Sequence, residues 1–264
     1  MNGKVYLVGA GPGDPELLTV KALRLLRTAD VVLHDDLVAP EILKLIPPSA
    51  DVRNVGKRNG SKTIRQEEIN FLMVTLAASG LQVVRLKSGD PLIFGRAGEE
   101  IEALRRANIE YEIVPGVTSA LGAAAAAGIP LTHRRASSTL VLAAGHHAAE
   151  NSSADWKGLT GQDSTLVIYM PGSNYGEVSN RLRAAGFTAE TPCAIISRAT
   201  TPQQQIHSTT VEHLARAPKL AAPTLLFVGD VVGLGDRDTS EPASLAQFES
   251  LSAEKPPINE EPLA

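Results

Sequence analysis

The chain has 264 residues, of which 43% are hydrophobic and 4% aromatic, a formal net charge of −4 and a single cysteine, Cys193. The length allows one large domain or two of ordinary size, and the acidic balance and the lack of an apolar run of about 18 residues exclude a typical nucleic-acid binder and a membrane-spanning protein. One cysteine excludes an internal disulfide and is typical of a reducing compartment, so we expect a cytoplasmic protein.

The first part of the chain alternates between predicted strands and amphipathic helices. Apolar residues recur at helical spacing over 16–29 and 66–80. This alternation predicts a mostly parallel sheet covered by helices, which places the chain in the α/β class. Strands are predicted over 4–9, 30–35, 51–56, 82–87 and 111–116.

A second series of strands follows the run PGVTSALGAAAAAGIPLTHRR over 115–135, whose alanine block favours a helix. We place a domain boundary in this run, which gives an N-terminal α/β domain over 1–115 and a C-terminal α/β domain over 116–235. Residues 236–264 are rich in proline, serine and acidic side chains, and are predicted to form a disordered acidic tail. The second series has strands over 138–145, 164–170, 192–199 and 223–232, with a helix over 176–187.

The first glycine-rich loop, GAGPGD over 9–14, lies between a predicted strand and a predicted helix. The dinucleotide-binding fingerprint requires glycine at its first, third and sixth positions, and the sixth position here is Asp14. Pro12 has no N–H group to offer a phosphate, and Asp14 would repel one. The pattern therefore disfavours a nucleotide-binding oxidoreductase. It leaves open either a loop that contacts a ligand through its backbone and the Pro12 ring, or a tight turn with no ligand.

Two further loops follow predicted strands. RLKSGDPLIFGRAGEE, over 85–100, repeats the Gly-Asp-Pro of the first loop, and VPGVTSALG occupies 114–122. Loops at the carboxyl ends of parallel strands face one crevice, where open α/β sheets bind ligands. Asp90 is accordingly either an acceptor for a ribose or amino group or a turn-forming Asp-Pro. Thr118 and Ser119 either reach the same ligand or cap the next helix.

Five segments together, VGAGPGDP, GKR, RLKSGDPLIFGRAGEE, VPGVTSA and GIPLTHR, resemble the uroporphyrinogen-III C-methyltransferases of the tetrapyrrole methylase superfamily. The resemblance runs from about Lys4 to Leu234, and Ser88 and Ala97 stand where the family usually has glycine. It implies two α/β domains with the active site in the cleft between them, a homodimer, and S-adenosyl-L-methionine as methyl donor, with S-adenosyl-L-homocysteine as product.

The resemblance also implies a tetrapyrrole substrate. Uroporphyrinogen III would be methylated at C2 and C7, through precorrin-1, to precorrin-2, a precursor of sirohaem, cobalamin and haem d1. Another precorrin methylase of the same superfamily is the alternative. By resemblance, the donor (SAM) pocket is lined by Pro12, Ser88, Gly89, Asp90, Ile93, Thr118, Ser119, Met170, Ala199 and Thr224.

Methyl transfer from a sulfonium is an in-line displacement, for which the alignment of donor and acceptor matters most. A proton must leave the macrocycle afterwards, so a base is expected near the ring. The resemblance makes Asp35 and Lys57 candidate proton acceptor and donor, although a strand-end or helix-capping acid is the simpler interpretation of Asp35. Arg96 is the third candidate catalytic residue and is expected to bind a substrate carboxylate.

The acceptor is rich in carboxylates, and a chain of net charge −4 must concentrate basic groups locally to hold it. Arginine pairs well with carboxylates because its donors match them in a fork. Glu99 stands one helical turn from Arg96 and is expected to orient it or to accept a pyrrole N–H. The histidines lack metal-ligand spacing, and we expect no metal. The expected substrate-binding residues are Lys57, Arg58, Arg96, Glu99, His133, Arg134 and Met170.

Overall fold

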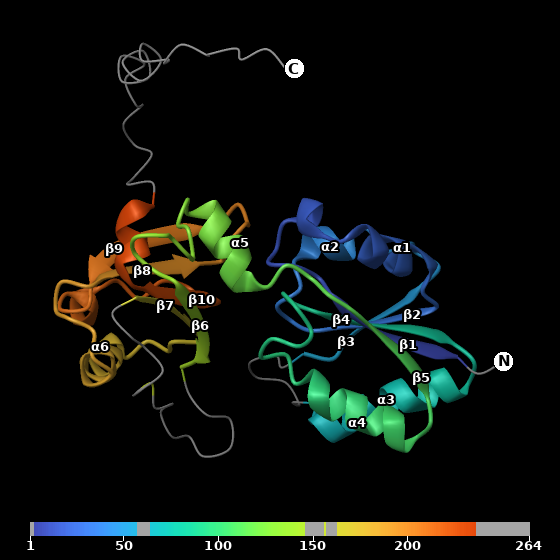
Figure 1. Cartoon of the computed structure of the whole chain (residues 1–264). Helices are drawn as coiled ribbons and strands as arrows, with labels where there is room; N and C mark the ends of the chain where they lie inside the picture. Colours follow the sequence, from blue (N-terminus) through green and yellow to red (C-terminus); the bar gives the residue numbers. More distant parts are fainter. Residues whose placement is uncertain (1–2, 57–63, 146–155, 157–162, 236–264) are drawn as a thin grey trace, which may run out of the picture.

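The computed structural model describes residues 3–56, 64–145, 156 and 163–235. These residues form two lobes, each built on a five-stranded sheet (Figure 1). The last strand of the first sheet ends at Val114 and the first strand of the second begins at Thr139. The domain division predicted near residue 115 remains a proposal. The predicted tail over 236–264 and the predicted site residues Lys57 and Arg58 lie outside the described residues.

The first sheet is parallel in every pair, with strand order β3-β2-β4-β1-β5. Parallel neighbours need crossover connections, and helices supply them here, as the alternating sequence predicts. Because all strands run in one direction, the loops that follow them emerge at one edge of the sheet. The strands are β1 (Lys4–Gly9), β2 (Val31–His34), β3 (Asp51–Asn54), β4 (Gln82–Lys87) and β5 (Glu110–Val114).

Helices cover both faces of the first sheet (Figure 1). Val83 packs toward α3 and α4, whereas its neighbour Val84 packs toward α1 and α2. This alternation explains why β1 and β2 are apolar at nearly every position, since both of their faces are buried. Thr19 caps α1 by accepting the N–H of Ala22, so the stretch 16–29 is not one helix as predicted. The elements are η1 (Pro15–Leu17), α1 (Val20–Thr28), α2 (Pro40–Leu43), α3 (Gln66–Ala78) and α4 (Ala97–Arg106).

The second sheet has the order β6-β7-β10-β8-β9 and is mixed: β6 and β7 are parallel, and the other pairs are antiparallel. A mostly parallel arrangement therefore holds for the first sheet only. The sequence did not predict β9, because this edge strand, QIHSTT, is largely exposed and lacks an apolar run. The strands are β6 (Thr139–Ala144), β7 (Ser164–Tyr169), β8 (Pro192–Ser197), β9 (Gln205–Thr210) and β10 (Thr224–Val228).

The predicted alanine-rich helix is α5 (Ser119–Ala126), which follows β5 and packs on the second sheet (Figure 1). Its small side chains, such as Ala120 and Ala123, let the helix backbone approach Val167 and Phe227 closely. The opposite face of this sheet is covered by α6 (Tyr175–Ala184) and η2 (Leu214–Arg216), and η3 (Asp230–Leu234) follows β10. No helix in the described part of the chain has the length and apolar character needed to cross a bilayer.

Candidate active site

A cavity of about 340 Å³ lies where the loops of the first sheet meet the second sheet. Its walls come from the loops after β1, β2, β4 and β5, the start of α5, and residues at the ends of β7, β8 and β10. All of the residues predicted to line a donor pocket line this one cavity, and their individual contacts with a donor stay predictions. They are Pro12, Ser88, Gly89, Asp90, Ile93, Thr118, Ser119, Met170, Ala199 and Thr224.

Glycine backbones hold three of these loops together. Gly11 and Gly89 exchange backbone hydrogen bonds of 3.1 and 2.7 Å, and both adopt positive φ, +74° and +67°. A β-carbon on Gly116 would overlap the carbonyl oxygen of Gly89 and lie 2.9 Å from the α-carbon of Gly9. The loops after β1, β4 and β5 therefore form one wall that only glycine permits at these contacts.

Asp90 joins the second loop to the third. Its Oδ1 accepts the N–H of Leu92 at 2.8 Å and its Oδ2 accepts the N–H of Gly116 at 3.0 Å. The turn-forming interpretation of this Asp-Pro is thus confirmed. Each carboxylate oxygen has a further lone pair, and the residue also lines the cavity, so a contact with a ligand stays compatible with this structural role.

The first loop connects the two lobes. The N–H of Asp14 donates to Oγ1 of Thr200 at 3.1 Å, and a β-carbon on Gly122 of α5 would lie 2.5 Å from Cγ of Pro12. The side chain of Asp14 caps η1 by accepting the N–H of Glu16 at 2.9 Å. The backbone donor and the carboxylate at the sixth fingerprint position are therefore both used within the protein, which explains why the phosphate-binding pattern is absent.

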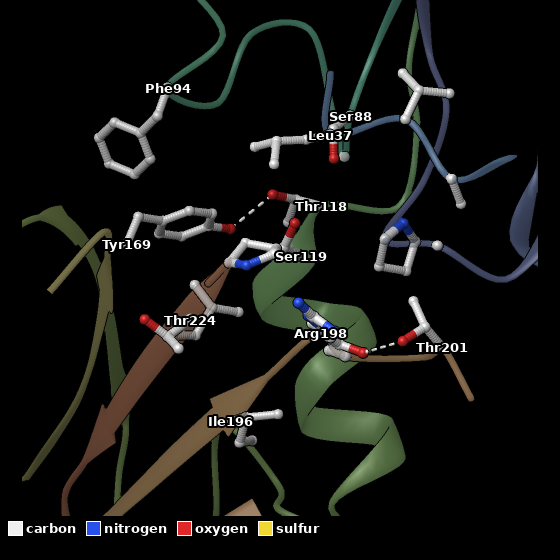
Figure 2. Close-up of a pocket in the computed structure, with 18 of the residues that line it drawn as sticks. Leu37, Ser88, Phe94, Thr118, Ser119, Tyr169, Ile196, Arg198, Thr201 and Thr224 are labelled. Carbon is white, nitrogen blue, oxygen red and sulfur yellow. Dashed lines mark hydrogen bonds between the residues drawn. The ribbon is translucent and has the colours of Figure 1, made fainter. Parts of the chain in front are cut away.

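The sequence analysis assigned no role to Tyr169, which ends an apolar strand. Its hydroxyl bonds to Oγ1 of Thr118 at 2.6 Å and accepts the N–H of Ala120 at 3.1 Å. Thr118 stands at the N-cap position of α5, yet its hydroxyl bonds to Tyr169 instead of capping the helix. Burial raises the pKa of the Tyr169 hydroxyl above its usual value. Figure 2 shows Phe94 beside this ring, with centroids 4.8 Å apart.

Several non-glycine residues at the cavity have left-handed backbones. Phe94, Met170 and Arg198 line it with φ of 52°, 52° and 47°, and the neighbouring Arg96 and Thr200 have φ of 55° and 62°. Such conformations cost roughly 1–3 kcal/mol each and gather at functional sites. No pattern in the sequence marked Arg198, or the segment after β2 that forms another wall; that segment comprises Asp36, Leu37, Val38, Ala39, Pro40 and Glu41.

Of the predicted acceptor-side residues that the structure describes, only Met170 lines the cavity. Arg96 and Glu99 form the expected ion pair, with Nε–Oε1 and Nη2–Oε2 distances of 2.8 and 2.7 Å. Glu99 raises the pKa of Arg96, and Arg96 in turn lowers that of Glu99. Asp35 makes an ion pair with Arg85 of β4.

His133 and Arg134 belong to a turn that the sequence placed at the substrate. The N–H of His133 donates to the carbonyl of Ser137 at 2.9 Å, and Arg134 is exposed. The structure does not bring this turn to the cavity lining.

Within the described ranges, no group of three or more His, Cys, Asp or Glu side chains is placed to hold a metal ion.

Residues 4–215 match the family model of the Tetrapyrrole (Corrin/Porphyrin) Methylases. A siroheme synthase of Pseudomonas paraeruginosa is 48% identical over 238 residues, which are 89% of this chain and 51% of that protein. The chain thus spans about half the length of the curated relatives it matches.

The chain covers a larger share of the solved structures that it matches than of the curated relatives. The uroporphyrin-III-C-methyltransferase of Thermus thermophilus is 44% identical with a TM-score of 0.76, covering 89% of this chain and 95% of that one. A structure of the Thermus thermophilus uroporphyrin-III C-methyl transferase complexed with S-adenyl homocysteine is 39% identical with a TM-score of 0.78, and it covers 88% of this chain and 100% of that one.

Proposed function

The chain belongs to the tetrapyrrole methylase family, and from this premise we propose that it is an S-adenosylmethionine-dependent C-methyltransferase of uroporphyrinogen III. The two methylations take place at C2 and C7 and lead through precorrin-1 to precorrin-2. The observation that carries the proposal is the single cavity that gathers every residue expected of a donor pocket. The related Thermus enzyme complexed with S-adenyl homocysteine supports this use of the cavity.

The cavity suits a donor of this size and polarity. Its volume of about 340 Å³ falls within the usual range of ligand sites, about 300–1,000 Å³. The hydroxyls of Ser88, Ser119 and Thr224 line it without a hydrogen-bond partner in the described part of the chain, and we assign them to the polar groups of the donor. S-adenosylmethionine, when bound, supplies a methyl group already activated by the positive charge on sulfur.

The protein contributes alignment rather than activation. The glycine contacts fix the loops after β1, β4 and β5, and Tyr169 fixes the start of α5 through Thr118 and Ala120. A rigid wall of this kind holds a donor in one orientation, which is worth about 7–11 kcal/mol of the barrier when both reactants are well aligned. Water exclusion follows from the apolar side chains of Ile93, Phe94 and others that line the cavity.

The acceptor binds beside the cavity, on the side of the loops after β2 and β4. We assign Asp35 as the proton acceptor, Lys57 as the proton donor and Arg96 as the cation that binds a substrate carboxylate. Arg96 is supported by its fixed fork on Glu99 and its half-exposed guanidinium. Arg58, Glu99, His133, Arg134 and Met170 are the further substrate-binding residues of this proposal.

The assembly and pathway are also proposals. We propose a cytoplasmic homodimer. Sedimentation of the purified protein tests whether it is a dimer. The product precorrin-2 supplies sirohaem formation, in keeping with the siroheme synthase relatives, and also cobalamin and haem d1 formation.

The test is an anaerobic incubation of the purified chain with uroporphyrinogen III and S-adenosylmethionine, followed by mass spectrometry. The expected product is heavier by two methyl groups. No mass gain would overturn the proposal, and faster turnover of a later precorrin would identify another methylase of the family. Calorimetry with S-adenosylhomocysteine and with NAD completes the test, since tight binding of NAD alone would favour an oxidoreductase.

A further inference from the structure

A cluster of four charged side chains lies at the carboxyl ends of β2 and β4, beside the cavity but not lining it. Glu100 Oε1 lies 2.9 Å from Nε of Arg85 and 3.0 Å from Nζ of Lys87, and Nη2 of Arg85 donates to Oδ1 of Asp35. The side chains of Arg85, Lys87 and Glu100 are only 2%, 3% and 0% exposed. Asp35, 31% exposed, is the member that reaches solvent.

The strand and helix geometry fixes this arrangement. Arg85 and Lys87 are two residues apart in β4, so both leave the sheet on the face that α3 and α4 cover. Glu100 comes from α4, and Gln66 of α3 donates to its Oε1 at 3.3 Å. Nη1 of Arg85 donates to the carbonyl of Leu33 in β2 at 3.3 Å. The guanidinium is thus held in one orientation, in which it bridges Glu100 and Asp35.

Stability alone explains such a cluster poorly. Burial, and then the neighbouring Arg85, lower the pKa of Lys87. Burial also opposes the charge of Arg85, but the carboxylates of Asp35 and Glu100 outweigh it and raise the pKa of Arg85. Replacing a buried ion cluster by apolar side chains of similar volume is often neutral or stabilising. The cluster is better explained by what it holds in place.

The cluster joins the two elements that carry the assigned acceptor-side residues. Asp35 directly follows β2, and Glu100 lies one helical turn after Arg96. A β-carbon on Gly95 would come within 3.2 Å of Cε of Lys87, so the stem of Lys87 supports the loop that leads to Arg96. The same cluster therefore sets the end of β2, the last residues of the loop after β4 and the start of α4 relative to one another.

We propose that Arg85, Lys87 and Glu100 are positioning residues, which fix the Asp35 carboxylate and the start of α4 for methyl transfer to the acceptor. The inference rests on the proposed function, because Asp35 and Arg96 have their roles only in that reaction. Oδ1 of Asp35 is anchored by Arg85. Oδ2 lies 4.0 Å from Nζ of Lys87 and accepts no hydrogen bond from any described residue, so it is available to the acceptor.

The first test is Arg85→Lys, which keeps the charge but loses the fork that bridges two carboxylates. The turnover number kcat should fall about ten- to hundredfold, the effect of misplacing a reacting group by about 1 Å. S-adenosylhomocysteine should bind as in the wild type, measured by calorimetry, because none of the cluster lines the cavity. The matched control is Arg106→Lys on α4, the helix that carries Glu100. Its partner Glu102 lies 3.1 Å away in an exposed pair, and the kcat of this variant should not change.

The second test is the double variant Lys87→Met with Glu100→Gln, which removes one charge of each sign and keeps the buried volume. It should melt near the wild-type temperature and bind S-adenosylhomocysteine normally, yet lose kcat, because Arg85 no longer has its anchor. A folded variant with full turnover would overturn the positioning role, as would a parallel loss of donor binding and turnover. Loss of the fold in both variants would assign the cluster to stability instead. A wild-type protein without activity on uroporphyrinogen III would overturn the proposed function, and this inference with it.

Discussion

Gly116→Ala tests the idea that glycine backbones build the donor wall. The added β-carbon would overlap the carbonyl oxygen of Gly89 and lie 2.9 Å from the α-carbon of Gly9. Both neighbours are backbone atoms, and non-bonded carbons normally stay about 3.5–4.0 Å apart, so the loops must separate by roughly 1 Å. Overpacking of this kind costs about 1–3 kcal/mol. Weakening the bond from the N–H of Gly116 to Asp90 adds about 1 kcal/mol.

The free energy of unfolding should therefore fall by about 2–4 kcal/mol, measured by urea unfolding. The affinity for S-adenosylhomocysteine, measured by calorimetry, should fall by about tenfold or more, since a 1 Å displacement disturbs every contact of the wall. The control is Gly176→Ala on α6, where the nearest atoms to the added β-carbon lie at 3.8 and 3.9 Å and alanine favours the helix. A Gly116→Ala protein with wild-type stability and donor affinity would refute the backbone-contact argument.

Four further variants test other parts of the structure. Arg96→Ala should lose most turnover while S-adenosylhomocysteine still binds, and unchanged kinetics would remove Arg96 from the reaction. Asp90→Ala should weaken donor binding first, because it releases two backbone N–H groups; unchanged calorimetric affinity would contradict this. Tyr169→Phe should lower the free energy of unfolding by about 1–3 kcal/mol, since it leaves Thr118 and a buried N–H without a partner, and urea unfolding measures this loss. Burial raises the pKa of Cys193 from 9.0 to about 12, so the protonated thiol favours the folded state and stability falls as pH rises through this interval. Cys193→Ala should show a smaller loss of unfolding free energy between pH about 8 and about 10.5 than the wild type, and an equal loss would contradict the assignment.

The resemblance to the family supplied the full set of donor-pocket residues, and local chemistry independently explains the part that comes from the first sheet. Glycine loops after parallel strands must converge at one sheet edge, and that rule alone brings Pro12, Gly89 and Ser119 together. Tyr169 and Arg198 were not predictable in this way. They reach the cavity through the packing of a second, mixed sheet. Its strands β7, β8 and β10 are buried at nearly every position, so their sequences do not show which pairs are antiparallel.

On the acceptor side, too, the sequence predicted a contact between near neighbours but missed one between residues far apart in the chain. The sequence placed Arg96 beside Glu99, because helical spacing fixes that pair, and the ion pair is present. It did not connect Asp35 with Arg85, because the two lie 50 residues apart and meet only through the pairing of β2 with β4. Charged residues inside a predicted buried strand were the one available signal, and a buried strand cation requires a carboxylate partner from elsewhere.

The first loop shows why two interpretations of one motif need not compete. Its tight turn is structural: the Asp14 N–H bonds across to Thr200, and the Pro12 ring packs against α5 at Gly122. Both contacts join the lobes, and the same Pro12 lines the cavity between them. A phosphate-binding loop would leave its N–H groups free at the helix start, so it would lack this connection. The contacts of the first loop with the second lobe therefore account for its departure from the nucleotide fingerprint, and a donor without phosphate leaves the loop free to make them.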